Sequence, residues 1–331
     1  MKKLLIMLMI LSITGVMGAI AEEITEPQVL IDFNDLAGTE INYGDVAGAG
    51  LKADDKANLK VDLGLKNWEV HLSSSSQVGE NVALTYVQPA QSNKEDEGWG
   101  KPTVLGVRIH FPEAAFNSYA IIQPPFNIPA YMDKTDENGN VAEADKGLGQ
   151  KFDNKGVLKN VATIKHVEMM VNGRNFPHGI GIILEDQNAE ERIIFVDYLR
   201  YTGWKKLIWK NPNYVEDVRN RELRSYPLYP RSQPFIKFKG IIIYRDAANI
   251  GGDFVTYVKD IKLGYDQAVT DDFELDINDE ALWGIVQQRE DRRKTAEIKR
   301  LGNLQVLRYL EEKKKYAGPD PAAADAATTT P

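Results

Sequence analysis

The 331-residue chain contains no cysteine and only four histidines. Without cysteine it has no disulfides and no thiolate ligands for a metal or a redox centre. Positive charge is also scarce, because 40 Lys and Arg are set against 48 Asp and Glu, which gives a formal net charge of −8. Such a chain has no basic field to attract phosphates, so we expect no nucleic-acid partner.

Long hydrophobic runs are missing except at the N-terminus, where residues 4–16 are almost wholly apolar. Two lysines precede this run, and Ala19 and Ala21 form a small-x-small cleavage site behind it. The pattern predicts a secretory signal peptide over residues 1–21 rather than an uncleaved anchor, since the run is short for a membrane span. Cleavage would remove two lysines and no acid, so the charge would change from −8 to 38 − 48 = −10. We expect no stable membrane insertion afterwards.

Short runs rich in Val, Ile, Leu and aromatic residues fill residues 28–265, separated by Gly, Asn, Asp and Ser. A period of two is clear in residues 235–239 and 255–263, whereas residues 179–184 and 193–199 are apolar throughout and are expected to be more fully buried. No segment between these runs has a helical period and length. The sequence therefore predicts a mainly β domain over residues 22–276, an antiparallel, jelly-roll-like β-sandwich.

The pattern changes near the C-terminus, where residues 277–316 are predicted to form a charged α-helix. Gly302 is expected to weaken this helix by about 1 kcal/mol relative to Ala. Its apolar residues must be buried either against the sandwich or against a partner helix. Residues 317–331 are rich in Ala, Thr and Pro and are expected to form a disordered tail.

The sequence contains no residues with catalytic or metal-binding spacing. His71, His110 and His166 lie in predicted strands without HxH or HxxxH spacing, and we interpret them as structural. The acidic run at residues 271–276 could supply paired carboxylates of a glycoside hydrolase, but an acidic connector explains it better. We expect no enzymatic activity, no cofactor and no metal site.

Two groups of residues are candidates for binding. The proline-rich insertion at 211–234 should run over the surface, and its Arg and Tyr side chains are of types enriched at interfaces. The candidate partner contacts are Tyr214, Arg219, Arg221, Arg224, Tyr226, Tyr229 and Arg231. The alternative is a capping loop packed on its own domain. Trp204 and Trp209 are candidates for stacking on sugars, although tryptophans in strands are more often part of the core.

Long, unusual strings are spread over residues 28–266. They include residues 104–113, 172–178, 211–214, 227–231, 242–246 and 251–254. These strings resemble the spirochaete flagellar filament outer-layer (sheath) proteins, the FlaA-type family. The C-terminal helix and tail are not part of the resemblance.

The resemblance implies a structural subunit that coats the flagellin core of the periplasmic flagellar filament and contributes to its stiffness, shape and motility. It implies export through the general secretory pathway, with core flagellin and copies of the chain itself as partners. It carries no catalytic motif. A secreted or periplasmic carbohydrate-binding β-sandwich module remains the alternative from the residues alone.

Overall fold

The computed structural model describes residues 26–44, 51–93, 99–136, 140–214, 229–230, 233–269, 277 and 279–316. The predicted signal peptide, with Ala19 and Ala21, lies outside these residues. The acidic run at 271–276 and the C-terminal tail also lie outside them.

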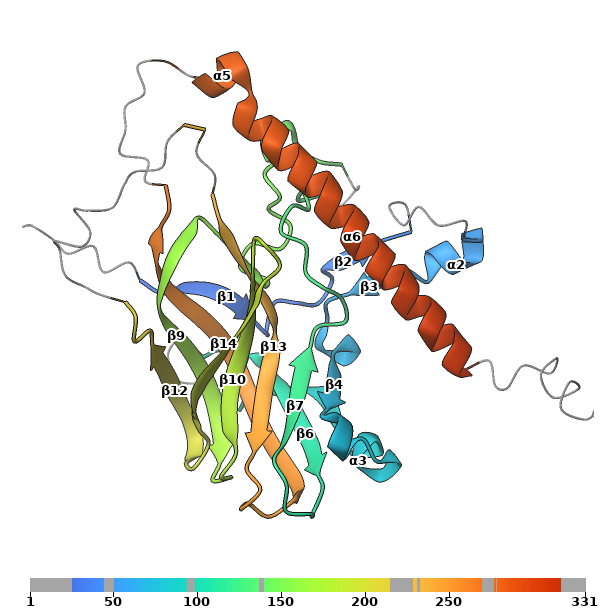
Figure 1. Ribbon diagram of the computed structural model, residues 1–331, viewed down its shortest axis with the longest axis vertical. Helices are drawn as coiled ribbons and strands as arrows, with labels where there is room; N and C mark the ends of the chain where they lie inside the picture. The colour runs from blue at the N-terminus through green and yellow to red at the C-terminus, as the bar shows by residue number, and fades with distance from the viewer. Residues whose placement is uncertain are drawn as a thin grey trace, which may run out of the picture.

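Two six-stranded antiparallel sheets pack against each other (Figure 1). Sheet I has the order β12-β9-β14-β6-β5, with β1 paired to β14, and sheet II has the order β11-β10-β13-β7-β4, with β8 paired to β13. Sheet I comprises β1 (Gln28–Asp32), β5 (Tyr86–Gln91), β6 (Thr103–Phe111), β9 (Val161–Arg174), β12 (Thr202–Lys210) and β14 (Gly252–Gln267). Sheet II comprises β4 (Glu69–Leu72), β7 (Ser118–Gln123), β8 (Val157–Lys159), β10 (Gly179–Asp186), β11 (Glu191–Tyr198) and β13 (Phe235–Arg245). The predicted mainly β, antiparallel sandwich is confirmed.

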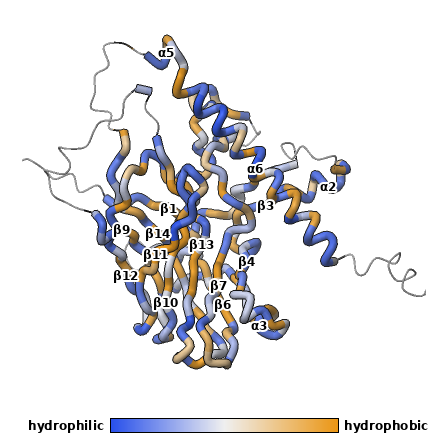
Figure 2. The backbone as a smooth tube through the Cα atoms, viewed as in Figure 1, coloured by the Kyte–Doolittle hydropathy of each residue, from blue (hydrophilic) through white to orange (hydrophobic). Residues whose placement is uncertain are grey.

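The core lies between the two sheets, where alternate residues of each strand point inward. Trp68 belongs to it, with its ring centroid 5.4 Å from that of Phe33 and 5.8 Å from that of Phe238. Figure 2 shows hydrophobic residues concentrated on the strands and mixed with hydrophilic ones along the C-terminal helix.

Several short elements lie outside the two large sheets. They are the two-stranded sheet of β2 (Glu40–Asn42) and β3 (Lys60–Asp62), the helices α2 (Ala53–Ala57) and α3 (Gly79–Ala83), and the 3₁₀ turns η1 (Leu65–Asn67), η2 (Ser74–Ser76) and η3 (Glu143–Asp145).

The C-terminal helical region is divided into α5 (Asp279–Trp283) and α6 (Ile285–Tyr316). The break occurs at Gly284, whose φ of +56° is in the left-handed region that favours glycine. The Glu280 carboxylate caps the new helix start by accepting hydrogen bonds from the N–H of Val286 at 3.0 and 3.1 Å. Gly302, expected to weaken the helix, lies buried within α6, which continues through it to Tyr316.

Candidate contact surfaces

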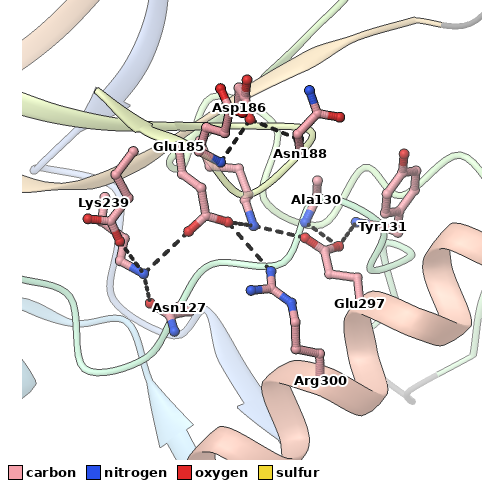
Figure 3. A network of polar contacts seen from close by, with 12 residues as sticks. Asn127, Ala130, Tyr131, Glu185, Asp186, Asn188, Lys239, Glu297 and Arg300 are labelled. Atoms are coloured by element: carbon pink, nitrogen blue, oxygen red, sulfur yellow. Dashed lines mark hydrogen bonds and ion pairs between the residues drawn. The ribbon is translucent and has the colours of Figure 1, made fainter. Parts of the chain in front are cut away.

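Helix α6 crosses the outer face of sheet II at one end (Figure 1), and a buried ion cluster fixes it there. Lys237 Nζ of β13 lies 2.6 Å from Glu185 Oε1 of β10 and 2.9 Å from Glu297 Oε1 of α6. All three side chains are at most 7% exposed. The other Glu297 oxygen accepts hydrogen bonds from the N–H of Ala130 (3.0 Å) and Tyr131 (3.2 Å), so both carboxylate oxygens have partners (Figure 3).

The Glu185 carboxylate lies among three cations of this cluster. Burial raises the pKa of Glu185, but the ion pairs with Lys237 and Lys239 outweigh burial and hold the pKa below its ordinary value. Lys239 Nζ lies 3.3 Å from the second Glu185 oxygen, and an Arg300 nitrogen of α6 lies 3.6 Å from the first (Figure 3). The carboxylate is therefore kept ionised by cations from both the sheet and the helix.

The contacts of α6 continue along its length. Arg308 pairs with Glu69 of β4 and donates to the carbonyl of Pro125 at 2.6 Å. Tyr309 donates to Asp55 at 2.7 Å, and Leu301 is 2% exposed in the hydrophobic core. Of the two alternatives for the helix, the structure thus shows packing on the chain's own sandwich.

Beyond the ion cluster, the outer face of sheet II is apolar over β10, β11 and β13, where no described element covers it. Ile183 and Ile242 are each only 3% exposed but lie outside the core between the sheets. Around them Ile193 is 56% exposed and Phe195 is 41% exposed. We call this surface the apolar half-face; its residues are Tyr119, Ile121, Ile183, Ile193, Phe195, Tyr198, Ile242 and Tyr244.

A glycine of β10, Gly179, shapes the apolar half-face. A Cβ at Gly179 would lie 2.5 Å from the Phe195 ring, so the absence of a side chain lets that ring lie across the strand. The Phe195 centroid is 5.1 Å from that of Tyr198 and 6.1 Å from that of Tyr244. Outer faces of antiparallel sandwiches are usually polar, and a contiguous exposed apolar patch marks an interaction site.

The expectation that residues 193–199 are fully buried is wrong for the outward-facing side chains of β11. Ile194 and Val196 pack against the core, but Ile193 and Phe195 point to the outer face. The apolar run therefore signalled two apolar faces, of which the described residues cover only one.

The outer face of sheet I has different chemistry. Its cross-strand register places Gln88, Gly106, Tyr257, Asn172 and Trp204 in one row across five strands. The neighbouring row contains the pair Tyr86 and Arg108. We call this surface, formed by Tyr86, Gln88, Arg108, Asn172, Trp204 and Tyr257, the aromatic–polar face.

One end of the aromatic–polar face carries a polar triad. Arg108 makes a bidentate pair with Asp253, with nitrogen–oxygen distances of 3.2 and 3.0 Å, and His110 Nδ1 lies 2.9 Å from the same carboxylate. These hydrogen bonds, led by that from Arg108, lower the pKa of Asp253 below its ordinary value. The triad holds one Arg cation against one carboxylate and is close to neutral when His110 is uncharged.

The two candidate sugar-stacking tryptophans lie on opposite faces of β12. Trp204 is on the outer face, and its ring centroid lies 4.9 Å from that of Trp99. Its Nε1 donates to the side-chain oxygen of Asn172 at 3.1 Å, with the Asn172 amide oriented so that its nitrogen donates to the carbonyl of Gly173. Trp209 packs against the core. Five residues apart in one strand, they cannot form a single platform.

Two of the candidate partner contacts in the 211–234 insertion are described. Tyr214 donates to Asp266 at 3.3 Å, with Lys165 5.4 Å from its ring centroid. Tyr229 donates to Glu280 at 2.8 Å. Desolvation, and after it the hydrogen bond and negative charge of Glu280, raise the pKa of Tyr229 to about 12. Arg219, Arg221, Arg224, Tyr226 and Arg231 lie outside the described residues.

The histidines have local partners or a packing role. His71 and His166 lie 3.1 and 3.8 Å from neighbouring glutamates. His178 is 3% exposed, between the rings of Phe111 and Phe254. Over the described ranges, no group of three or more His, Asp or Glu is arranged to hold a metal ion.

Within the same ranges, the helices include none with the length and apolar character needed to cross a membrane. The fold therefore defines the chain as an antiparallel β-sandwich with a clamped C-terminal helix and two broad, chemically distinct outer faces.

Comparison with known proteins gives the family. The model of the flagellar filament outer layer protein family, FlaA, matches residues 32–274, and the chain belongs to this family. It is 48% identical to a flagellar filament outer layer protein of Spirochaeta aurantia over 95% of this chain and 94% of that one. It is 38% identical to the protein of the same name from Treponema pallidum (strain Nichols), again over 95% and 94%. Neither the family description nor these names denotes an enzyme.

Among solved structures, similarity is found to a CBM61 module in complex with β-1,4-galactotriose. That match has 9% identity, covers 61% of this chain and 90% of the module, and has a TM-score of 0.27. A family 11 carbohydrate-binding module from Clostridium thermocellum matches with 11% identity, the same coverage and the same TM-score. Scores this low carry no functional conclusion.

Proposed function

We propose that the protein is a structural subunit of the outer layer of a periplasmic flagellar filament. We also propose that it is exported to the periplasm through the general secretory pathway. Family membership and the N-terminal sequence pattern support this role. As a coating subunit it would contact core flagellin and copies of itself, and so contribute to filament stiffness, shape and motility.

The observation that carries the proposal is the apolar half-face. A subunit that remained single in solution would expose Ile193, Phe195 and Tyr198 to water, whereas a packed layer would cover them. Aromatic residues are enriched in the buried centres of interfaces. The half-face is therefore the surface we assign to subunit contact.

Co-sedimentation with purified filaments tests both parts of this proposal. We expect the protein to pellet with filaments and Phe195→Lys to remain largely in the supernatant. Val78→Lys, which changes an apolar residue that is 59% exposed outside the half-face, is the matched control and should pellet normally. A protein that does not pellet contradicts the filament role, and normal pelleting of Phe195→Lys contradicts the assigned surface.

The absence of native cysteine allows the partner to be identified. Tyr198→Cys places a single thiol at the rim of the half-face, where a short bifunctional reagent can cross-link it within assembled filaments. A product with core flagellin assigns the half-face to radial contact, and a dimer of this chain assigns it to lateral contact.

The carbohydrate-binding alternative finds support in one feature, the aromatic–polar face. That face can be tested separately from assembly.

A further inference from the structure

We propose that the outer face of sheet I is a carbohydrate-binding site for a neutral oligosaccharide that lies across the strands from β5 to β12. The inference does not depend on the filament role, because it rests on the side chains of this face alone.

Three aromatic rings lie along this face. Tyr86 is 43% exposed at one end, Tyr257 is half-buried in the middle, and Trp204 lies at the other end. A Cβ at Gly106 would lie 3.3 Å from the Tyr257 ring, so this glycine in the middle of β6 gives the ring room to lean across the strand. Aromatic faces pack against the C–H surfaces of sugar rings, which are apolar despite the surrounding hydroxyls.

Planar polar side chains alternate with these rings. The Arg174 guanidinium lies 5.5 Å from the Tyr257 centroid, and that of Arg108 lies 5.9 Å from the Tyr86 centroid. Gln88 lies in the same row as Tyr257, on the exposed strand β5. Amide, guanidinium and carboxylate groups supply the fixed donors and acceptors that hydroxyl groups require.

The charge pattern favours a neutral ligand over an anion. Arg108 is paired with Asp253, and Lys259, 5.1 Å from the Trp99 centroid, pairs with Asp260 at 2.9 Å. Cations that already have carboxylate partners attract a further anion weakly. A hydroxyl-rich, uncharged ligand can use the same groups without displacing those partners.

The dimensions of the face suit a chain of sugars. A groove of about 240 Å³ is lined by Tyr86, Gln88, Gly106, Arg108, Val255 and Tyr257. From β5 to β12 the row crosses four inter-strand spacings, or about 19 Å. The groove is lined by residues of β5, β6 and β14 and so extends over only part of this row. A single sugar would fill the groove, and a longer chain would continue toward Trp204.

The opposite outer face provides the internal control. The apolar half-face has aromatic rings but consists of Ile, Phe and Tyr, and its polar neighbours lie at the rim, where Arg200 is 5.3 Å from the Tyr198 ring centroid and Asp246 accepts from the Tyr198 hydroxyl at 3.5 Å. A sugar's hydroxyls would lose water there without gaining partners, which is unfavourable.

The test is saturable binding of the purified protein to an array of neutral hexose, pentose and N-acetylhexosamine oligosaccharides, with titration calorimetry on the strongest binder. Tyr257→Ala and Tyr86→Ala should each weaken binding by about tenfold. Tyr257→Phe, which keeps the ring, and Phe195→Ala, on the opposite face, should bind within about threefold of wild type. Tyr86 is exposed, so its variant reports on binding even if Tyr257→Ala folds poorly.

A second arm distinguishes the two sources of such a ligand, a free polysaccharide and a glycan attached to filament proteins. Binding to filament proteins that is lost after their deglycosylation identifies attached glycans, and binding only to free oligosaccharides identifies the free source. Absence of saturable binding by the folded protein overturns the proposal, as does wild-type binding by both Tyr86→Ala and Tyr257→Ala. Binding confined to acidic glycans and abolished by salt overturns the neutral ligand. The outcomes that overturn sugar binding leave the filament role standing, because co-sedimentation tests that role.

Discussion

The two sheets share one core, but their outer faces are built from different side chains. Sheet I presents aromatic rings together with paired charges, whereas sheet II is crossed by a charged helix at one end and is apolar over the surface of β10, β11 and β13. A two-layer sandwich needs only one apolar face per sheet to fold. The second apolar face of sheet II is therefore not needed for the two sheets to pack, and among the described residues α6 covers only one end of it.

The largest effect is expected where α6 is clamped to sheet II. Lys237→Met leaves the Glu185 and Glu297 carboxylates buried without their shared cation and should lower the free energy of unfolding by about 3–5 kcal/mol. Urea denaturation measures the change. Lys239→Met, whose side chain is 21% exposed, is the matched control and should have a clearly smaller effect. Equal losses of unfolding free energy for the two variants would show that burial of Lys237 does not decide how much the ion cluster stabilises the fold.

Protonation of His178 tests the core that supports both faces. Burial, followed by the nearby Arg245 charge, lowers the pKa of His178 to about 4 from an ordinary value of 6.5. The folded state then resists protonation while the unfolded state accepts it, so stability present above pH 6.5 is lost as the pH falls toward 4. Between pH 7 and pH 4.5 the loss should be about 2–3 kcal/mol.

His178→Phe is the control for this pH effect, since three phenylalanines already surround the site. Denaturation curves collected at both pH values should show a shallower pH dependence for the variant. Parallel dependences in wild type and variant would mean that other groups account for the acid sensitivity.

A matched pair of truncations compares the two outer faces directly. Ile242→Ala removes a 3% exposed side chain from the apolar half-face and should cost about 2 kcal/mol. Val255→Ala, at a half-buried outer position of sheet I, should cost less than about 1 kcal/mol. Thermal unfolding resolves the difference, and a larger loss for Val255→Ala would reverse the contrast.

The smallest effect is expected at the polar triad of sheet I. Asp253 is 51% exposed, so Asp253→Asn should change stability by less than about 1 kcal/mol despite its bidentate partner Arg108. Chemical denaturation in low and high salt measures this. A loss comparable to that of Lys237→Met would indicate that this triad, like the cluster under α6, is structurally essential.

Period-two alternation was sufficient to predict the strands and the antiparallel class, because each strand needs one apolar face wherever the sheets pack. The apolar runs of β10, β11 and β13 are the signals for the half-face. They do not distinguish a buried face from an exposed one, because periodicity reports how many faces are apolar and not what covers them. The Trp204 and Trp209 pair could have been rejected from their spacing of five.

The sequence by itself determined the acidic, cysteine-free character of the protein, the mainly β sandwich, the C-terminal helix and the family, since these follow from composition, local periodicity and long specific strings. Only the tertiary structure decided that α6 packs on sheet II through Lys237 and Glu297, residues 60 positions apart. It alone brought Tyr86, Arg108, Tyr257 and Trp204 onto one face, because cross-strand register joins residues that are distant in sequence.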